Sequence, residues 1–137
     1  MANLLEENDV FRETFSFTQA QVDQFAQVSG DKNPIHWDEA YAAKTVFKKP
    51  IIHGFLGGSV FSKILGTQFP GEGTIYLKQE MKFMKPMYVG TEYEAVITIN
   101  TIDRAKHRAT VHTQVLEKST GASVIEGEAN VMNMTRL

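Results

Sequence analysis

The stretch "HGFLGGSVFSKILGTQF", residues 53–69, decides the fold that the sequence predicts. Its apolar residues fall on most sides of a helix, which is the pattern of a helix buried on most sides. Gly54, Gly57 and Gly58 lie in its first turns, and a glycine inside a helix costs roughly 1 kcal/mol relative to alanine. Their presence indicates that other groups approach the backbone closely. We therefore expect one long central helix that is almost enclosed.

The segments around this helix alternate apolar and polar residues, which is the period of a half-buried strand. One such segment precedes the helix and four follow it, at residues 9–18, 74–90, 91–102, 107–118 and 122–134, and "KPMYVG", residues 85–90, provides a break at the end of the second. The later segments are joined by short turns, so that their strands pair in antiparallel fashion. The fold class predicted is α+β, with a curved antiparallel sheet wrapped around the central helix.

Two shorter helices are expected between the first strand and the central helix. Thr18 and Gln21 form a capping-box pattern before an amphipathic stretch, and Gly30 is a suitable stop. Residues 38–45 predict a second short helix with acidic residues in its first turn.

Length and composition favour one globular domain over residues 1–137. The apolar content of 42% is enough for a core. The formal net charge of −2 and the lack of a basic block give no support to a nucleic-acid surface. The absence of cysteine excludes disulfides, thiolate metal ligands and a cysteine nucleophile.

Location and assembly are also predicted from the sequence. The first residues include acids early and lack the continuous apolar run of a signal peptide, and no window reaches the length of a membrane span. We therefore expect a cytoplasmic protein that does not bind membranes.

A sheet curled around one helix leaves an exposed edge, and pairing with a second copy covers such an edge, so a homodimer is expected.

The loop "SGDKNPIH", residues 29–36, combines an acid and an imidazole with two residues that restrict the backbone. Gly30 permits a sharp exit from the preceding helix, and Pro34 fixes its own φ. Rigidity of this kind is what a pair of catalytic groups requires. Asp31 and His36, on either side of one water molecule, could polarise it and transfer its protons.

Ordinary turn chemistry is the alternative explanation for this loop. Asp31 and Asn33 are residue types that hydrogen-bond to their own backbone in turns. If the loop is part of a site, Asn33 adds a neutral donor and acceptor to it.

The start of the central helix offers a second candidate group. The first N–H groups of a helix lack internal partners and form the positive end of its dipole. A glycine at Gly54 lets a carbonyl oxygen approach them, so that the backbone itself could stabilise an oxyanion. The alternative is that the glycines serve close packing of the helix on the sheet.

Two blocks of the sequence together resemble the MaoC-like, (R)-specific enoyl-CoA hydratase family. They are "FAQVSGDKNPIHWDEAYA", residues 25–42, and "FKKPIIHGFLGGSVFS", residues 47–62. The pattern of the family is Asp-x-Asn-Pro-aliphatic-His, followed by a His-Gly that opens the central helix. It is matched at Asp31, Asn33, Pro34, Ile35 and His36, and then at His53 and Gly54.

This resemblance implies a hot-dog fold and a homodimer with its sites near the subunit interface. It implies the reversible addition of water to a trans-2-enoyl thioester, giving the (R)-3-hydroxyacyl thioester. By position, Asp31 and His36 are similar to the catalytic acid–base pair, and the N–H of Gly54 to the donor for the thioester oxygen. Asn33 would support the geometry of the site. The partner molecule implied is a thioester of CoA or of acyl-carrier protein, and no cofactor is implied.

Further positions of the substrate site follow from the same resemblance. Ser62 is similar to a family serine near the acid–base pair, and Ser59 is an alternative to it. Leu65, together with Asn130 and Met132 of the last strand, would define the end of the acyl-chain tunnel.

The spacing of the four histidines does not suggest a metal site, so no metal ion is expected. His53 is interpreted as a structural residue at the start of the central helix. His107 and His112 are interpreted as surface or packing residues.

Three other functions are compatible with this fold. A thioesterase would need a carboxylate on or near the central helix, and residues 54–69 contain none. A dehydratase for carrier-protein substrates performs the same chemistry in reverse, and the sequence does not separate the two. A non-catalytic module that binds acyl thioesters would not need both Asp31 and His36.

Overall fold

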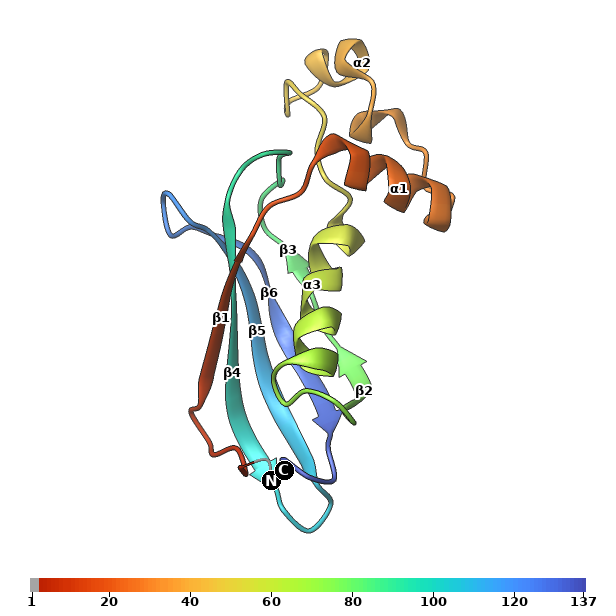
Figure 1. Cartoon of the computed structure of the whole chain (residues 1–137). Helices are drawn as coiled ribbons and strands as arrows, with labels where there is room; N and C mark the ends of the chain where they lie inside the picture. The colour runs from red at the N-terminus through yellow and green to blue at the C-terminus, as the bar shows by residue number, and fades with distance from the viewer. Residues whose placement is uncertain (1–2) are drawn as a thin grey trace.

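The computed structural model describes residues 3–137, which form six strands and three α-helices (Figure 1). In chain order the elements are β1 (Val10–Phe15), α1 (Gln19–Ser29), a 3₁₀ helix η1 (Pro34–His36), α2 (Glu39–Ala43), α3 (Gly54–Thr67), β2 (Ile75–Gln79), β3 (Lys82–Phe83), β4 (Tyr93–Asp103), β5 (Arg108–Glu117) and β6 (Ser123–Met132).

The strands form one antiparallel sheet in the order β1-β4-β5-β6-β2, and β3 also pairs with β6. The sheet curves around α3, while α1 and α2 extend beyond one end of it (Figure 1). The predicted α+β class and the predicted layout of sheet and helix are thus confirmed. Within residues 3–137, none of the helices is both long and apolar enough to cross a bilayer.

The core lies between α3 and the concave face of the sheet. α3 contributes five large side chains to it, namely Leu56, Val60, Phe61, Ile64 and Leu65. The opposite side of this helix is open in the single chain, because Phe55 is 71% exposed and Ser59 and Ser62 are also exposed. The expectation of a nearly enclosed helix therefore holds only for the side that faces the sheet.

The predicted capping box and stop of α1 are confirmed, and α2 also has a side-chain cap. The Thr18 hydroxyl accepts from the Gln21 N–H, and the Gln21 side chain accepts from the Thr18 N–H. Gly30 ends α1 with a φ of 78°, a left-handed conformation that favours glycine. Asp38 caps α2 by accepting from the Tyr41 N–H.

The prediction of one long strand within residues 74–90 is wrong. The segment forms two short strands, β2 and β3, because the regular ladder with β6 is interrupted at Glu80 and Met81, although the Glu80 N–H still donates to the Glu128 carbonyl at 2.8 Å. The Glu80 carbonyl crosses directly over Gly127 of β6, where an added Cβ would lie 1.7 Å from its oxygen. The break turns Met81 toward α3, where it occupies the space left by Gly58.

We predict that Gly127→Ala destabilises the protein by about 1–3 kcal/mol, because the new methyl group collides with backbone rather than with a side chain that can move. Gly66→Ala is the matched control. It adds the same methyl group where nothing lies within 4 Å, and it gains about 1 kcal/mol of helix propensity. Thermal unfolding followed by circular dichroism measures both variants, and an unchanged Tm for Gly127→Ala would contradict the prediction.

Candidate active site

The loop after α1 is held in shape by its own polar side chains. The Ser29 hydroxyl accepts from the Asp31 N–H at 3.1 Å, and Asp31 Oδ1 accepts from the Asn33 N–H at 3.2 Å. Asn33 Oδ1 then accepts from the Ile35 N–H at 3.2 Å and caps η1. The turn chemistry expected as an alternative is therefore present. It uses Oδ1 of Asp31 and leaves Oδ2 for another contact.

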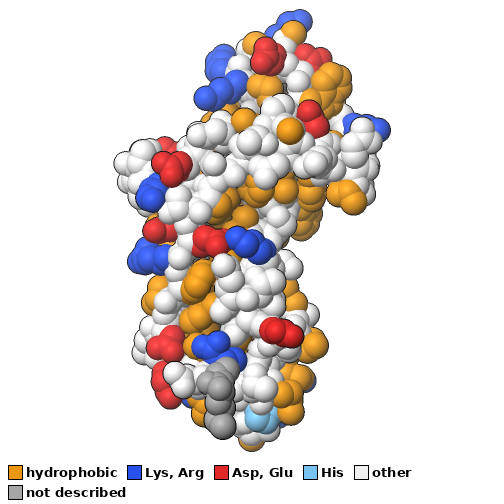
Figure 2. All heavy atoms as spheres, in the orientation of Figure 1, with side chains coloured by type: hydrophobic (Ala, Val, Ile, Leu, Met, Phe, Trp, Pro, Cys, Tyr) orange, Lys and Arg blue, Asp and Glu red, His pale blue; other side chains and the backbone are white. Residues whose placement is uncertain are grey.

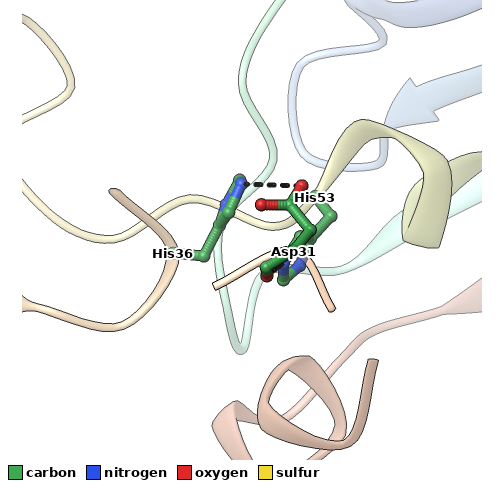
Figure 3. A group of neighbouring side chains, drawn as sticks. All are labelled: Asp31, His36 and His53. Carbon is green, nitrogen blue, oxygen red and sulfur yellow. Dashed lines mark hydrogen bonds and ion pairs between the residues drawn. The ribbon is translucent and has the colours of Figure 1, made fainter. Parts of the chain in front are cut away.

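His36 faces this second oxygen from a buried position. The residue is only 8% exposed, and its Nδ1 lies 2.7 Å from the carbonyl oxygen of Ile51. Because a carbonyl only accepts, Nδ1 carries the proton in this contact and Nε2 has a free lone pair. Nε2 lies 4.0 Å from Oδ2 of Asp31, whose side chain is 51% exposed (Figure 3). The structure thus brings together the acid and imidazole predicted from the sequence.

The surroundings of His36 favour its neutral form. Burial lowers the pKa of the imidazole below its ordinary 6.5, and the neighbouring His53 lowers it further. The hydrogen bond to the Ile51 carbonyl and the charge of Asp31 act in the opposite direction but do not reverse the shift of the pKa. The ring is therefore neutral at pH 7, with Nε2 available as a proton acceptor.

His53 belongs to the same cluster, a placement that sequence reasoning missed. It directly precedes α3, as expected, but its side chain makes no cap bond to the helix. Its Nε2 instead lies 2.9 Å from the backbone oxygen of Asp31, and its ring stacks on the ring of His36 with centroids 3.7 Å apart. The only signal in the sequence was its position beside Gly54, since the contact with His36 spans two separate loops.

The cluster of Asp31, His36 and His53 resembles a metal-ligand set in composition, with candidate ligand atoms within 4.8 Å of one another. Its geometry does not suit one ion. A metal binds an imidazole nitrogen in the ring plane at about 2.0–2.1 Å, whereas these two rings lie face to face at an interplanar angle of 25°. One nitrogen of each ring also bonds to a backbone carbonyl. The arrangement suits proton transfer better than metal binding.

A cavity of about 540 Å³ adjoins this cluster and lies beside the first turn of α3. Asp31, His53 and Gly54 line it together. Most of its remaining wall is apolar and includes Phe25, Phe47, Ile51, Phe83, Met84 and Met87. Figure 2 shows apolar side chains gathered in the hollow beneath α1, near the start of α3. The cavity therefore joins a polar end to an apolar wall.

The remaining predicted site residues lie elsewhere in the single chain. Asn33 is exposed and acts within the loop. Ser62 is exposed on the open side of α3, and Leu65 is completely buried in the core, so that neither lines this cavity. Asn130 is half-buried and lines a separate depression with Lys78.

Comparison with known proteins gives the chain its class. The family described as MaoC like domain matches residues 1–122. The (R)-specific enoyl-CoA hydratase of Aeromonas caviae is 42% identical over 130 residues, which are 95% of this chain and 96% of that protein. A mitochondrial 3-hydroxyacyl-acyl-carrier-protein dehydratase of Arabidopsis thaliana is 33% identical and covers 94% of this chain and 78% of its own length.

Solved structures agree with these sequence matches. An (R)-hydratase from A. caviae involved in PHA biosynthesis has a TM-score of 0.90 at 41% identity and covers 94% of this chain and 97% of that chain. An R-hydratase from Pseudomonas aeruginosa has a TM-score of 0.88 at 38% identity, with 94% and 82% covered. The fold is thus that of the hot-dog hydratases, a class of hydro-lyases. Within it, the chain belongs to the MaoC-like family, as the sequence predicted.

We predict that the ring of His36 titrates with a midpoint below 6.5, because burial disfavours its charged form. The Cε1 proton signal in an NMR pH titration measures this midpoint directly. Asp31→Asn should lower it further, since the Asp31 charge is one of the two effects that raise the pKa of His36. A midpoint at or above 6.5 in the wild type would contradict the buried, neutral base.

Proposed function

We propose that the chain is an (R)-specific hydratase that adds water to trans-2-enoyl-CoA and catalyses the reverse dehydration. The observation that supports this most directly is the pair formed by Asp31 and His36, 4.0 Å apart, of which Asp31 lines the same cavity as Gly54. The acid and the imidazole can handle the protons of a water molecule, and the N–H of Gly54 can bind a thioester oxygen.

The spacing of the pair suits a shared water molecule. At 4.0 Å the two groups are too far apart for a direct hydrogen bond. A water oxygen about 2.8 Å from both atoms, which is an ordinary hydrogen-bond distance, lies beside the line that joins them. Nε2 of neutral His36 and the carboxylate of Asp31 both accept hydrogen bonds from this water, so its lone pair is directed away from them, toward a substrate.

The reaction has a simple balance. The water gives one proton to the acid–base pair as its oxygen forms a bond to Cβ of the enoyl group. The electrons of the double bond move onto the thioester, and they return to form the bond between Cα and a proton supplied by the pair. The transition state places negative charge on the thioester oxygen. The N–H of Gly54, in the first turn of α3, supplies a donor for this oxygen at the positive end of the helix dipole.

The apolar wall of the cavity suits the acyl chain, since ligand sites are mostly apolar with a few polar groups that fix orientation. Lys85 also lines it and offers a cation for a phosphate of CoA.

An acyl-carrier-protein substrate is the second candidate, because a relative that is 33% identical is named as a dehydratase for such substrates. Thioester hydrolysis fits less well, because α3 contains no carboxylate. The roles of Asn33, Ser62 and Leu65 stay predictions.

We predict that the purified protein hydrates crotonyl-CoA and that Asp31→Asn lowers kcat by a factor of about 100–10,000, the usual contribution of acid–base catalysis. The amide keeps the size of the carboxylate, and its oxygen can still accept from the Asn33 N–H, so KM should change little. Loss of the ultraviolet band of the conjugated enoyl thioester measures the rate. An (R)-specific dehydrogenase reads the configuration of the product.

The controls for this assay separate the alternatives. Release of free thiol, followed in parallel, would move the function to hydrolysis. Near wild-type turnover in Asp31→Asn would remove this residue from the mechanism. No reaction with crotonyl-CoA, but dehydration of a 3-hydroxyacyl carrier protein, would establish the second candidate.

We also propose that residues 1–137 act as one domain that works as a homodimer. β2 is an edge strand that pairs only with β6, and four of its five residues are exposed. Large apolar side chains lie open on this strand and beside it, namely Phe55, Ile75, Leu77, Phe83 and Met84. An exposed apolar edge of this kind favours pairing with another chain. Phe55 and Phe83 also line the cavity, so this interface would adjoin the site.

We predict that Leu77→Asp turns the dimer into a monomer, because it places a charge on the exposed edge formed by β2. Val46→Asp is the matched control, since Val46 is 85% exposed but lies outside β2 and the residues around it. Size-exclusion chromatography with light scattering measures the mass of each. A monomeric wild type, or a Leu77→Asp variant that remains dimeric, would refute this interface.

A further inference from the structure

We propose that His53 is a positioning residue that holds both members of the Asp31–His36 pair in their working geometry. It does so through a hydrogen bond to the backbone of Asp31 and by stacking on the ring of His36. This inference rests on the proposed function, because it assigns a role to a third residue of the same site. His53 itself need not touch the reacting atoms.

The first contact fixes the backbone of the acid. Nε2 of His53 lies 2.9 Å from the carbonyl oxygen of Asp31, which sits in an exposed loop just after the end of α1. The local bonds of this loop join neighbouring residues only. The hydrogen bond from His53, in contrast, joins Asp31 to a residue far away in the sequence. It connects the loop to the start of α3.

The second contact fixes the plane of the base. The rings of His53 and His36 stack with centroids 3.7 Å apart and an interplanar angle of 25°. Phe25 of α1 packs on His53 with its ring centroid 4.8 Å away. His53 is therefore held between an aromatic ring and His36, and it is only 2% exposed. Movement of His36 out of its plane would require His53 and Phe25 to move as well.

One nitrogen of His53 has no partner among the protein atoms, so that the hydrogen bond of its ring to a protein group is the one to Asp31. Its Nδ1 is the one buried side-chain polar atom in residues 3–137 that has no hydrogen-bond partner. Because Nε2 faces a carbonyl, Nε2 carries the proton and Nδ1 has a bare lone pair. Leaving such an atom buried costs about 1–3 kcal/mol. A phenylalanine would avoid this cost but could not hold Asp31.

His53 also connects the pair to the helix whose N-terminus faces the cavity. It directly precedes Gly54, and its carbonyl oxygen accepts the N–H of Gly57 at 3.1 Å in the first turn of α3. One residue therefore links the proposed oxyanion donor, the backbone of Asp31 and the imidazole of His36. A shift of about 1 Å in such groups can lower a rate by about 100-fold.

Two substitutions separate the two contacts. His53→Gln places an amide nitrogen near the position of Nε2 and can keep the bond to Asp31, but it loses the stacked ring. His53→Phe keeps a flat ring against His36 and loses the bond. His112→Gln is the matched control, because His112 lies half-buried in β5 beside Glu126, away from the site.

The kinetic expectation is a loss of kcat with little change in KM, since the contacts of the 2% exposed His53 ring are with Asp31, His36 and Phe25. We expect each variant to lose about 10–100-fold in kcat, and His112→Gln to match the wild type. Circular dichroism and Tm show whether each variant is folded. If a variant is folded and turns over crotonyl-CoA at the wild-type rate, the contact that it lacks does not position the Asp31–His36 pair.

A pH profile distinguishes positioning from simple destabilisation. The titratable groups that face the His36 ring are Asp31 on its own loop and His53 at the start of α3. Replacing His53 with glutamine removes a neighbour that disfavours a charge on His36, so that the acid limb of kcat/KM should move to higher pH. A purely structural loss would lower activity equally at every pH and leave the limb in place.

The same experiment separates the inference from the function on which it rests. If the wild type fails to hydrate any enoyl thioester, the proposed function falls. The NMR titration of His36 then still tests His53, because the midpoint should rise in His53→Gln whatever the reaction is. An active wild type with an unmoved midpoint and unmoved kinetics in both variants would overturn the role of His53 alone.

Discussion

α3 packs closely against its neighbours at the glycines of its first turns, where a larger residue would have to displace the ends of neighbouring side chains. An added Cβ at Gly57 would lie 2.7 Å from the sulfur of Met87 and 3.1 Å from a methyl group of Ile125, and at Gly58 it would lie 2.6 Å from the sulfur of Met81. This close packing fixes the direction and depth of the helix in the concave sheet. Its N-terminus is thereby held at the edge of the cavity, where Gly54 presents its backbone.

The pair of acid and base depends on the contrast between its two members. His36 is almost fully buried and neutral, with one nitrogen committed to the Ile51 carbonyl. Asp31 lies half in solvent, with one oxygen committed to its own loop. Each side chain therefore has one anchored atom and one free atom, and the free atoms face each other. A rigid pair of this kind handles protons without first having to reorganise its surroundings.

Local sequence signals predicted the parts of the molecule that depend on nearby residues. The cap at Thr18 and the stop at Gly30 involve contacts within a few residues, and both predictions are confirmed. The break between β2 and β3 depends on Gly127, which lies far along the chain in β6, so that the alternating pattern of residues 74–90 could not reveal it. The central helix and its sheet were predictable because their hydrophobic periods extend over many residues.

The candidate site divides in the same way. Asp31 and His36 share one loop, so their spacing along the chain is informative by itself. His53 joins them only because α3 is docked on the sheet, and the spacing of histidines along the chain does not report that contact. Ser62 faces the open side of α3 in the single chain. The sequence could not show which side this is, because the apolar residues of this helix fall on most of its sides.

The position of the water in relation to the helix N-terminus determines which reaction such a cavity favours. Hydrolysis needs the water at the carbon bonded to the oxygen that α3 stabilises. Hydration needs it two carbons further along the acyl chain, with the conjugated bonds transmitting charge back to the same oxygen. In the proposed mechanism the groups that hold the water come from the loop after α1, whereas the donor comes from α3. A carboxylate on α3 would bring the water toward the carbonyl carbon. The lack of one leaves the acid and imidazole of the loop to place it, and addition to the double bond is the reaction that this separation favours.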